Sequence, residues 1–276
     1  YKRQPRFYLH GGDMVANGGS LNQWLLFFQI EGPLARYAPL APTYGNHDRG
    51  LYQQMFSLPT NLDTQGYYYS WDYGSVHFVH ASSETVGPVQ EAALLADLES
   101  ALLSYPWPRF IVFCLHRNFY ANGGHSGDEN YPYSTAWGPI LEQYHVALVI
   151  QGHNHYYERS YPMNHEKEID DSHQYTFEEP KYPMYVITGG WGAPLYDHPY
   201  PDAWWVARYE KKYHFILVDI YPNGTLHLQA IDIEGEVFDS IRIEKPVKTT
   251  LRVPERTIHL LHVLPSEYAL PFPLLK

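Results

Sequence analysis

Residues 146–162 read VALVIQGHNHYYERSYP, and this stretch decides how the rest of the chain is interpreted. Its first five residues are all apolar, which is typical of a strand buried on both faces of a parallel sheet. The strand leads into Gly152-His153-Asn154-His155, where two imidazoles stand two positions apart. Because histidine is the commonest metal ligand, two imidazoles on one loop can address two neighbouring ions. The motif therefore predicts a metal site where a buried strand ends.

Three other strand-like segments also end in polar loops. Residues 7–10, 41–44 and 110–115 are the strands, and the loops after them are Gly12-Asp13, Gly45-Asn46-His47-Asp48 and His116-Arg117. In open α/β sheets, sites form at the carboxyl ends of strands, so we expect all four loops to meet at one edge. Carboxylate, amide and imidazole ligands without any thiolate suit zinc, iron or manganese. The four loops together predict a site for a pair of divalent or transition metal ions.

The segments around these loops alternate between strands and helices, as in an α/β protein. Ser20 and Gln23 have the spacing of a capping box and predict the start of a helix. Pro88 opens a second predicted helix over residues 88–103. Residues 67–71 and 76–81 predict a β-hairpin.

After residue 162 the helical patterns stop. Residues 185–188 predict a strand, and three later segments predict an antiparallel meander: 215–220, 225–231 and 237–243. Residues 1–245 are therefore expected to form one catalytic domain. Prolines punctuate residues 246–276 without a clear period, so we expect this tail to be an extended arm or a disordered end.

The composition excludes several classes of protein. Aromatic residues make up 16% of the 276 residues, which is too many for a disordered chain. No run reaches the roughly 18 apolar residues that a membrane span needs. The formal net charge of -11 argues against binding to a nucleic acid backbone. A single cysteine, Cys114, excludes an internal disulfide framework.

The order of the motifs GD, GNHD, H and GHNH resembles the calcineurin-like metallophosphoesterase superfamily. The run from Gly152 to Pro162 is similar to the GHxHxYERxxP signature of purple acid phosphatases and their bacterial relatives. Residues 188–196, TGGWGAPLY, resemble the later glycine-rich block of the same proteins. The likeness extends from Phe7 to Ile243, which is nearly the whole chain.

This resemblance implies a four-layer α/β/β/α sandwich with two metal ions, iron, zinc or manganese, at the sheet edge. Asp13 would bridge the two ions, and His155 would bind one of them. The other ion would be bound by Asn46, His116 and His153. His47 and His125 would lie over the substrate phosphate, where they would stabilise the transition state or protonate the leaving oxygen.

The chain departs from the family pattern in two ways. The tyrosine that binds iron(III) in purple enzymes is replaced by Ala16, so no iron(III)–tyrosinate centre is expected. The family also has an earlier strand that ends in an aspartate ligand, and only twelve residues, none of them acidic, precede Asp13. We therefore expect the chain to be a fragment that lacks its N-terminal strand; the alternative is a protein that has lost this ligand.

The resemblance implies hydrolysis of phosphate monoesters by a metal-bridging hydroxide, acting on a small phosphorylated substrate. One alternative is a phosphodiesterase or nucleotide phosphohydrolase on the same scaffold. Another is an inactive or single-metal protein that acts by binding. Relatives are mostly exported, so an extracytoplasmic or secreted location is favoured. Aromatic and imidazole residues that could shape the pocket are Tyr120, His125, Tyr156, Trp191, Trp204 and Trp205.

Overall fold

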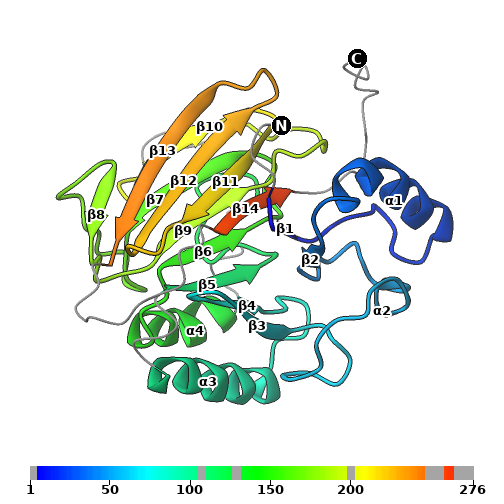
Figure 1. The fold of residues 1–276 in the computed structure, drawn as a ribbon, viewed down its shortest axis with the longest axis horizontal. Coiled ribbons are helices and arrows are strands. Elements are labelled where there is room, and N and C mark those ends of the chain that lie inside the picture. The colour runs from blue at the N-terminus through cyan, green and yellow to red at the C-terminus, as the bar shows by residue number, and fades with distance from the viewer. Residues whose placement is uncertain (1–4, 105–109, 126–131, 198–202, 246–257, 264–276) are drawn as a thin grey trace.

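The fold places two β-sheets face to face, with helices over the outer face of one sheet and beside one end of the other (Figure 1). The structure is a computed structural model that describes residues 5–104, 110–125, 132–197, 203–245 and 258–263. The described strands form two seven-stranded sheets, with orders β2-β1-β14-β11-β12-β13-β8 and β10-β7-β9-β6-β5-β4-β3. This arrangement confirms the expected α/β/β/α sandwich.

The first sheet begins with the strands that lead into the GD and GNHD loops. β1 (Phe7–His10) pairs in parallel with β2 (Leu40–Pro42), and α1 (Leu21–Ala35) connects them. The meander predicted near the C-terminus is confirmed as β11 (His214–Ile220), β12 (Thr225–Asp232) and β13 (Val237–Glu244). A short strand, β8 (Thr176–Glu178), pairs with β13 in parallel.

The second sheet is mostly parallel at its centre. β3 (Tyr69–Tyr73) and β4 (Val76–His80) form the predicted hairpin. Parallel pairing then continues through β5 (Phe110–Leu115), β6 (Leu148–Gln151) and β9 (Met184–Thr188). The antiparallel strands at the other side are β7 (Tyr157–Pro162) and β10 (Val206–Glu210).

Helices α3 (Pro88–Leu103) and α4 (Pro132–Gln143) cover the outer face of the second sheet (Figure 1). Leu94 and Leu98 of α3 and Trp137 of α4 pack there against Ile111 and Phe113 of β5. α3 begins at Pro88 as predicted, because proline is well suited to the first turn of a helix. A further helix, α2 (Tyr52–Met55), is a single turn after the GNHD loop.

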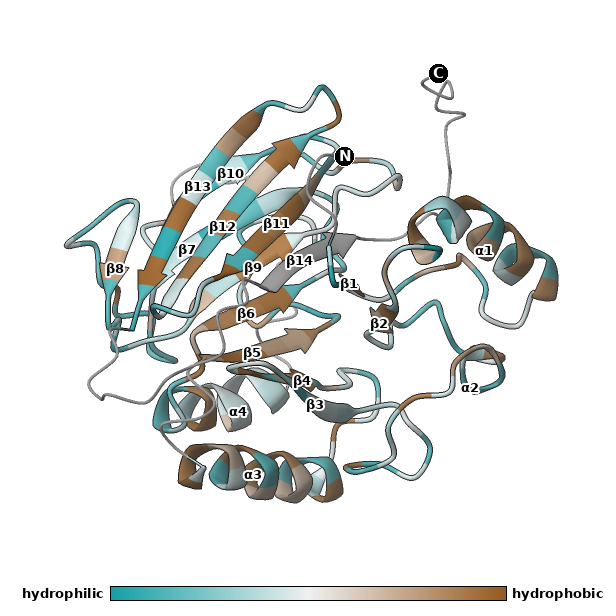
Figure 2. Cartoon of the chain, viewed as in Figure 1, coloured by the Kyte–Doolittle hydropathy of each residue, from teal (hydrophilic) through white to brown (hydrophobic). Residues whose placement is uncertain are grey.

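The core between the sheets explains the hydropathy pattern of the strands. Buried side chains from both sheets, including Leu9, Val112, Ile150 and Val218, form one cluster. Figure 2 shows β5 and β6 as hydrophobic along their length, whereas β12 and β13 alternate. The former are covered on both faces, and the latter have one face toward solvent.

The start of α1 differs from the sequence expectation. Ser20 is the N-cap residue, but its side chain makes no capping hydrogen bond. Gln23 does not close a capping box, because its Oε1 accepts a hydrogen bond from the backbone of Asn17 at 2.8 Å. The Gln23 side chain, which a capping box would require, is therefore hydrogen-bonded to the glycine-rich turn at residues 17–19 instead.

Part of the C-terminal tail differs from the expectation, because residues 258–263 form a strand of the first sheet. They form β14 (Ile258–Val263), which pairs in parallel with β1 and antiparallel with β11. Without β14, the facing edges of β1 and β11 would have unpaired backbone N–H and C=O groups. β14 forms backbone hydrogen bonds with both strands. The other residues of 246–276 lie outside the described part of the chain.

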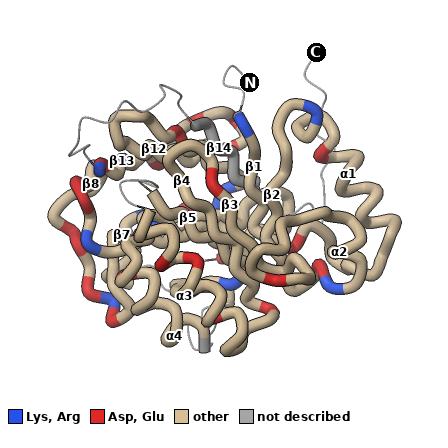
Figure 3. The backbone as a smooth tube through the Cα atoms, turned by 60° about the horizontal axis from the view of Figure 1, so that its bottom comes forward, with Lys and Arg blue, Asp and Glu red and all other residues tan. Residues whose placement is uncertain are grey.

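The surface is acidic overall, and basic and acidic residues are interspersed over the peripheral loops and helices (Figure 3). Among the described residues, no helix combines the length and apolar character needed to cross a membrane.

Candidate metal centre

Four strands end around the side chain of His116, the residue that follows β5. Its Nε2 atom lies 3.1 Å from Asp13 Oδ2, 3.1 Å from Asn46 Oδ1 and 3.2 Å from His153 Nδ1. Asp13 follows β1, Asn46 follows β2 and His153 follows β6, so both sheets contribute at their carboxyl ends. Asp13, His116 and His153 are buried, and their ligand atoms lie within 4.8 Å of one another.

This convergence suits a cation. The Nδ1 atom of His116 lies 2.7 Å from the carbonyl oxygen of Gly11 and donates its proton there. Nε2 can carry at most one further proton, which cannot satisfy three acceptors. Two imidazole nitrogens, a carboxylate oxygen and an amide oxygen match the ligand preferences of zinc, iron and manganese. The donor set therefore fits a metal ion of the kind that the sequence motifs predict.

The electrostatics of Asp13 and His116 are mutually dependent. Burial opposes protonation of His116, but the Asp13 carboxylate outweighs burial and raises the pKa of His116 to about 9. Burial also opposes ionisation of Asp13, but the nearby charge of His116 lowers its pKa below the usual value. A bound cation would take over the role of the imidazolium proton, because metal binding requires the neutral imidazole.

The backbone is adapted to bring these side chains together. Asp13 has φ 55° and His153 has φ 63°, in the left-handed region that costs non-glycine residues about 1 kcal/mol or more. Gly45 is packed so closely that a Cβ atom there would lie 2.3 Å from Asp13 Oδ1. A side chain at this position would therefore push the carboxylate out of place.

Asp48 is a supporting residue whose role sequence reasoning missed. Its buried carboxylate accepts hydrogen bonds from the backbone N–H groups of Asp13, Met14 and Gly45 at 2.9, 2.8 and 2.9 Å. Burial and the Asp13 charge raise the pKa of Asp48, and the amide donors act against that rise. Asp48 thereby fastens the GD loop to the GNHD loop. Its place in the GNHD motif was the available signal.

His155 lies outside the three-residue cluster and is held by the glycine-rich loop. Its Nδ1 donates to the carbonyl oxygen of Pro194 at 2.9 Å, and its ring stacks on Tyr196 with centroids 4.2 Å apart. Burial lowers the pKa of His155, so the neutral form that binds metal is favoured. Tyr196 also contacts the ring of His125, at 5.7 Å, and was missed by the sequence reasoning.

The two histidines expected over the substrate are exposed at this edge. The backbone N–H of His47 donates to Asp13 Oδ1 at 2.8 Å, and its ring Nδ1 lies 2.9 Å from the carbonyl oxygen of Ala16. The ring of His125 lies 4.2 Å from that of His153. The structure therefore brings both rings to the rim of the centre.

A charged cluster that sequence reasoning missed lies beside His153. The buried carboxylate of Glu84 accepts from Arg117 Nε at 2.6 Å and from Arg49 Nη2 at 3.0 Å. Arg117 Nη1 in turn lies 3.3 Å from His153 Nε2. Burial raises the pKa of Glu84, but Arg117 lowers it by more, so the carboxylate stays ionised. Two arginines and one glutamate leave the rim of the centre positive.

Some of the aromatic residues that could shape the pocket are buried, and others lie at the surface. Tyr120, Tyr156 and Trp205 are buried, and Tyr156 donates its hydroxyl to the carbonyl oxygen of Gly123 at 3.2 Å. Trp204 is 63% exposed and donates to the carbonyl oxygen of Lys167. The buried residues therefore support the loops of the centre.

Known proteins resemble this chain over more than half of its length. A sequence model described as calcineurin-like phosphoesterase matches residues 2–157. Human acid phosphatase type 7 is 26% identical over 269 residues, covering 87% of this chain and 61% of the relative. A barley nucleotide pyrophosphatase/phosphodiesterase is 22% identical over 273 residues, covering 88% of this chain and 73% of the relative.

A structure of purple acid phosphatase PPD1 from yellow lupin seeds has the same fold, with a TM-score of 0.79 at 23% sequence identity. The match covers 87% of this chain and 46% of the lupin chain. The chain thus spans about three fifths of the human relative and about half of the lupin protein.

Proposed function

We propose that this chain, which belongs to the calcineurin-like phosphoesterase family, hydrolyses the phosphate monoesters of small molecules. One observation carries the proposal: an oxygen of Asp13, an oxygen of Asn46 and a nitrogen of His153 all lie 3.1 to 3.2 Å from a single nitrogen of His116. Such a set binds a divalent or transition metal ion, and the family membership connects that ion with phosphoester hydrolysis.

In this proposal Asp13 would contribute its carboxylate to two ions. Asn46, His116 and His153 would help to hold one of them, and His155 would help to hold the other. When bound, the ions neutralise charge on the phosphate oxygens and acidify the attacking water. The second ion has fewer protein ligands among the described residues, so we expect it to bind more weakly than the first.

The residues at the rim would act on the substrate directly. The Nδ1 atom of His47 lies against the carbonyl oxygen of Ala16, so Nδ1 carries a proton and Nε2 is the nitrogen that would exchange a proton with the substrate. It can hold a proton for the leaving oxygen. His125, beside His153 on the opposite loop, can donate to a phosphate oxygen. The arginines around Glu84 add positive charge that attracts an anionic substrate.

The test is the variant Asp13→Asn, measured for metal content and for hydrolysis of 4-nitrophenyl phosphate. We expect the wild-type chain to bind manganese or zinc and to turn over the ester. The variant should lose metal and activity together, because an amide binds cations more weakly than a carboxylate does. Asp171→Asn, at an exposed loop position, is the control and should change neither. If the wild-type chain and a longer form with its upstream sequence both lack metal and turnover, the alternative of a binding protein is favoured.

A second candidate function is hydrolysis of phosphodiesters or nucleotides. The observation in its favour is the Arg49–Glu84–Arg117 cluster, whose exposed Arg49 suits a substrate that extends beyond the phosphate under attack. The barley relative is named for such an activity. Comparing turnover of 4-nitrophenyl phosphate with that of bis(4-nitrophenyl) phosphate decides between the two, and we expect the monoester to be the better substrate.

A further inference from the structure

The asparagine between the two histidines of the GHNH loop is hydrogen-bonded to the neighbouring loop, which follows β5. Asn154 is fully buried, and so is Asn118 in that neighbouring loop. Asn154 Nδ2 donates to Asn118 Oδ1 at 2.7 Å, and Asn118 Nδ2 donates to the carbonyl oxygen of Gly152 at 2.9 Å. Asn154 Oδ1 accepts the backbone N–H of His125 at 2.7 Å. The two amides thus join the loop after β5 to the loop after β6.

The direction of these hydrogen bonds is fixed at both ends by the backbone. The N–H of His125 can only donate and the carbonyl of Gly152 can only accept, so each side-chain amide must present oxygen on one side and nitrogen on the other. A carboxylate offers no donor when ionised, and an aliphatic side chain offers neither group. Among side chains of this size, an amide is therefore what positions 118 and 154 require.

The backbone just before His125 packs directly on the Asn154 amide. A Cβ atom at Gly124 would lie 2.3 Å from Asn154 Oδ1 and 3.0 Å from Cδ2 of Tyr196. Gly124 also has φ 54°, a conformation that glycine adopts at little cost. The chain at residues 124–125 is therefore held between Asn154 and Tyr196, and its position depends on the Asn154 side chain.

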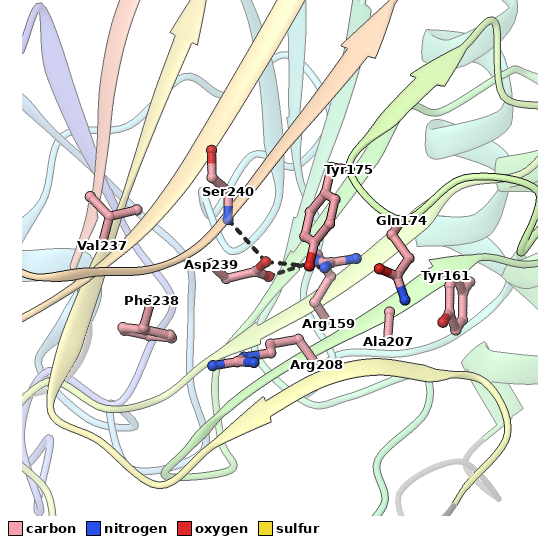
Figure 4. Close-up of a pocket in the computed structure, with 10 residues that line it drawn as sticks. All are labelled: Arg159, Tyr161, Gln174, Tyr175, Ala207, Arg208, Val237, Phe238, Asp239 and Ser240. Carbon is pink, nitrogen blue, oxygen red and sulfur yellow. Dashed lines mark hydrogen bonds and ion pairs between the residues drawn. The ribbon is translucent and has the colours of Figure 1, made fainter.

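The GHNH loop gives this contact a rigid support, because packed strands hold both of its ends. β6 precedes the loop and pairs in parallel with β5. β7 follows the loop and is joined to β13 of the other sheet by Arg159, which donates to both carboxylate oxygens of Asp239 (Figure 4). Asn154 can therefore fix the backbone of His125 relative to both sheets.

We propose that Asn154, supported by Asn118, is a positioning residue that holds the His125 imidazole over the substrate phosphate. The proposal rests on the proposed function, in which His125 donates to a phosphate oxygen. The His125 side chain is exposed, and its ring lies 4.2 Å from that of His153. An exposed side chain keeps rotational freedom of its own, so a fixed backbone limits where the ring can reach. A catalytic group misplaced by about 1 Å can lose about 10²-fold in rate.

Amide hydrogen exchange of the full chain, followed at His125 by NMR, tests the contact without any turnover. We expect the His125 N–H to exchange about tenfold or more faster in Asn154→Ala, because the variant removes its acceptor. Asn118→Ala should act in the same direction by a smaller factor, because Asn154 keeps its oxygen but loses the partner that orients it.

Asn164→Ala is the matched control for both variants. Asn164 is also a buried asparagine whose Oδ1 accepts two backbone N–H groups, at 3.0 and 2.8 Å, but it does so within its own loop after β7. This variant should lose a similar set of hydrogen bonds while the exchange rate of His125 and the turnover stay at the wild-type level.

A double-mutant cycle on hydrolysis of 4-nitrophenyl phosphate tests whether Asn154 acts through His125. Asn154→Ala should keep its metal and lower kcat/KM about tenfold or more. In a His125→Ala background the same change should have almost no further effect, because residues that act as one unit are not additive. Asn118→Ala gives a second cycle of the same kind if Asn154→Ala does not fold.

Three results would overturn the proposal: unchanged exchange at His125 in Asn154→Ala, loss of metal from that variant, or equal losses of kcat/KM with and without the His125 ring. An equal loss in Asn164→Ala would overturn it too, because general destabilisation would then explain the effect. Absence of turnover in the wild type would count against the proposed function, and the exchange rates would still decide whether Asn154 holds His125.

Discussion

Close backbone packing at Gly45 holds the carboxylate of Asp13 beside His116. The loops approach each other so closely that any side chain at position 45 would overlap both the backbone nitrogen and Oδ1 of Asp13, each at 2.3 Å. The Asp13 carboxylate can therefore occupy this position only because residue 45, in the neighbouring loop, has no Cβ atom. The carboxylate of Asp48 also holds the two loops together, because it accepts hydrogen bonds from backbone N–H groups of both.

Gly45→Ala tests this packing directly. We expect it to weaken metal binding at least about tenfold, because a ligand displaced by about 1 Å loses the geometry that the site requires. Gly32→Ala, within α1, is the matched control because a Cβ there meets no atom within 4 Å. The control should keep its metal and gain up to about 1 kcal/mol of stability. Metal content and the free energy of unfolding are the two measurements.

His47→Ala tests the separation of metal binding from proton transfer. His47 touches the centre through its backbone, which donates to Asp13, whereas its exposed ring is directed to the carbonyl oxygen of Ala16. The variant should therefore keep its metal while kcat falls about 10²–10⁴-fold, the usual contribution of a general acid. His173→Ala, at an exposed loop position, should behave as wild type. Loss of metal from His47→Ala would instead assign this imidazole to an ion.

At the scale of elements, the β3–β4 hairpin is joined to α3 by a buried histidine between two carboxylates. His77 lies 2.8 Å from Asp72 and 2.9 Å from Asp97, and Asp97 also accepts from the hydroxyl of Ser70 at 2.7 Å. Burial opposes protonation of His77, but Asp97 and then Asp72 outweigh it and raise the pKa of His77. The hairpin that precedes β5 is thus fastened to the helix that covers it.

This arrangement predicts a pH dependence of stability. A pKa raised in the folded state means that the folded chain holds the proton more tightly than the unfolded chain does. The stabilisation is therefore complete below the unfolded pKa of about 6.5 and is lost as the pH rises through the folded value. Denaturant unfolding of wild type and His77→Gln from pH 5.5 to 8.5 checks this. The stability difference should shrink as the pH rises; a constant difference would contradict the prediction.

At the scale of the whole molecule, the first sheet depends on a strand from the far end of the chain. β14 lies between β1 and β11, so it connects the strand that leads to Asp13 with the C-terminal meander. The same sheet supplies half of the core against the second sheet. The candidate metal centre, which takes ligands from both sheets, depends on this connection.

Leu261→Pro tests the contribution of β14. Leu261 pairs with Tyr8 on one side and with Leu217 on the other, and proline cannot donate a backbone hydrogen bond in the ladder. We expect the free energy of unfolding to fall by about 3 kcal/mol, with weaker metal binding because β1 is less well held. Leu261→Val keeps the backbone donor and should cost less than about 1.5 kcal/mol. Equal stability of the two variants would mean that β14 contributes little.

The elements that could be predicted from the sequence are those whose burial is visible in a short window. The apolar runs of β5 and β6, the proline at the start of α3 and the alternating strands of the meander each carry their own pattern. The candidate ligands were readable for a related reason: each follows directly after such a strand, and the carboxyl ends of neighbouring parallel strands meet.

The features that only the tertiary structure decided are contacts between distant segments. Arg159 and Asp239 are 80 residues apart, Glu84 and Arg117 are 33 apart, and β14 pairs with β1 across nearly the whole chain. The local sequence does not identify these partners, because a charged residue or an apolar run has the same sequence whichever distant segment it contacts. Their pairing follows from which backbone and charged groups the two packed sheets leave to be satisfied. The sequence thus determined the loops of the candidate metal centre, and the packing of the sheets decided what holds them in place.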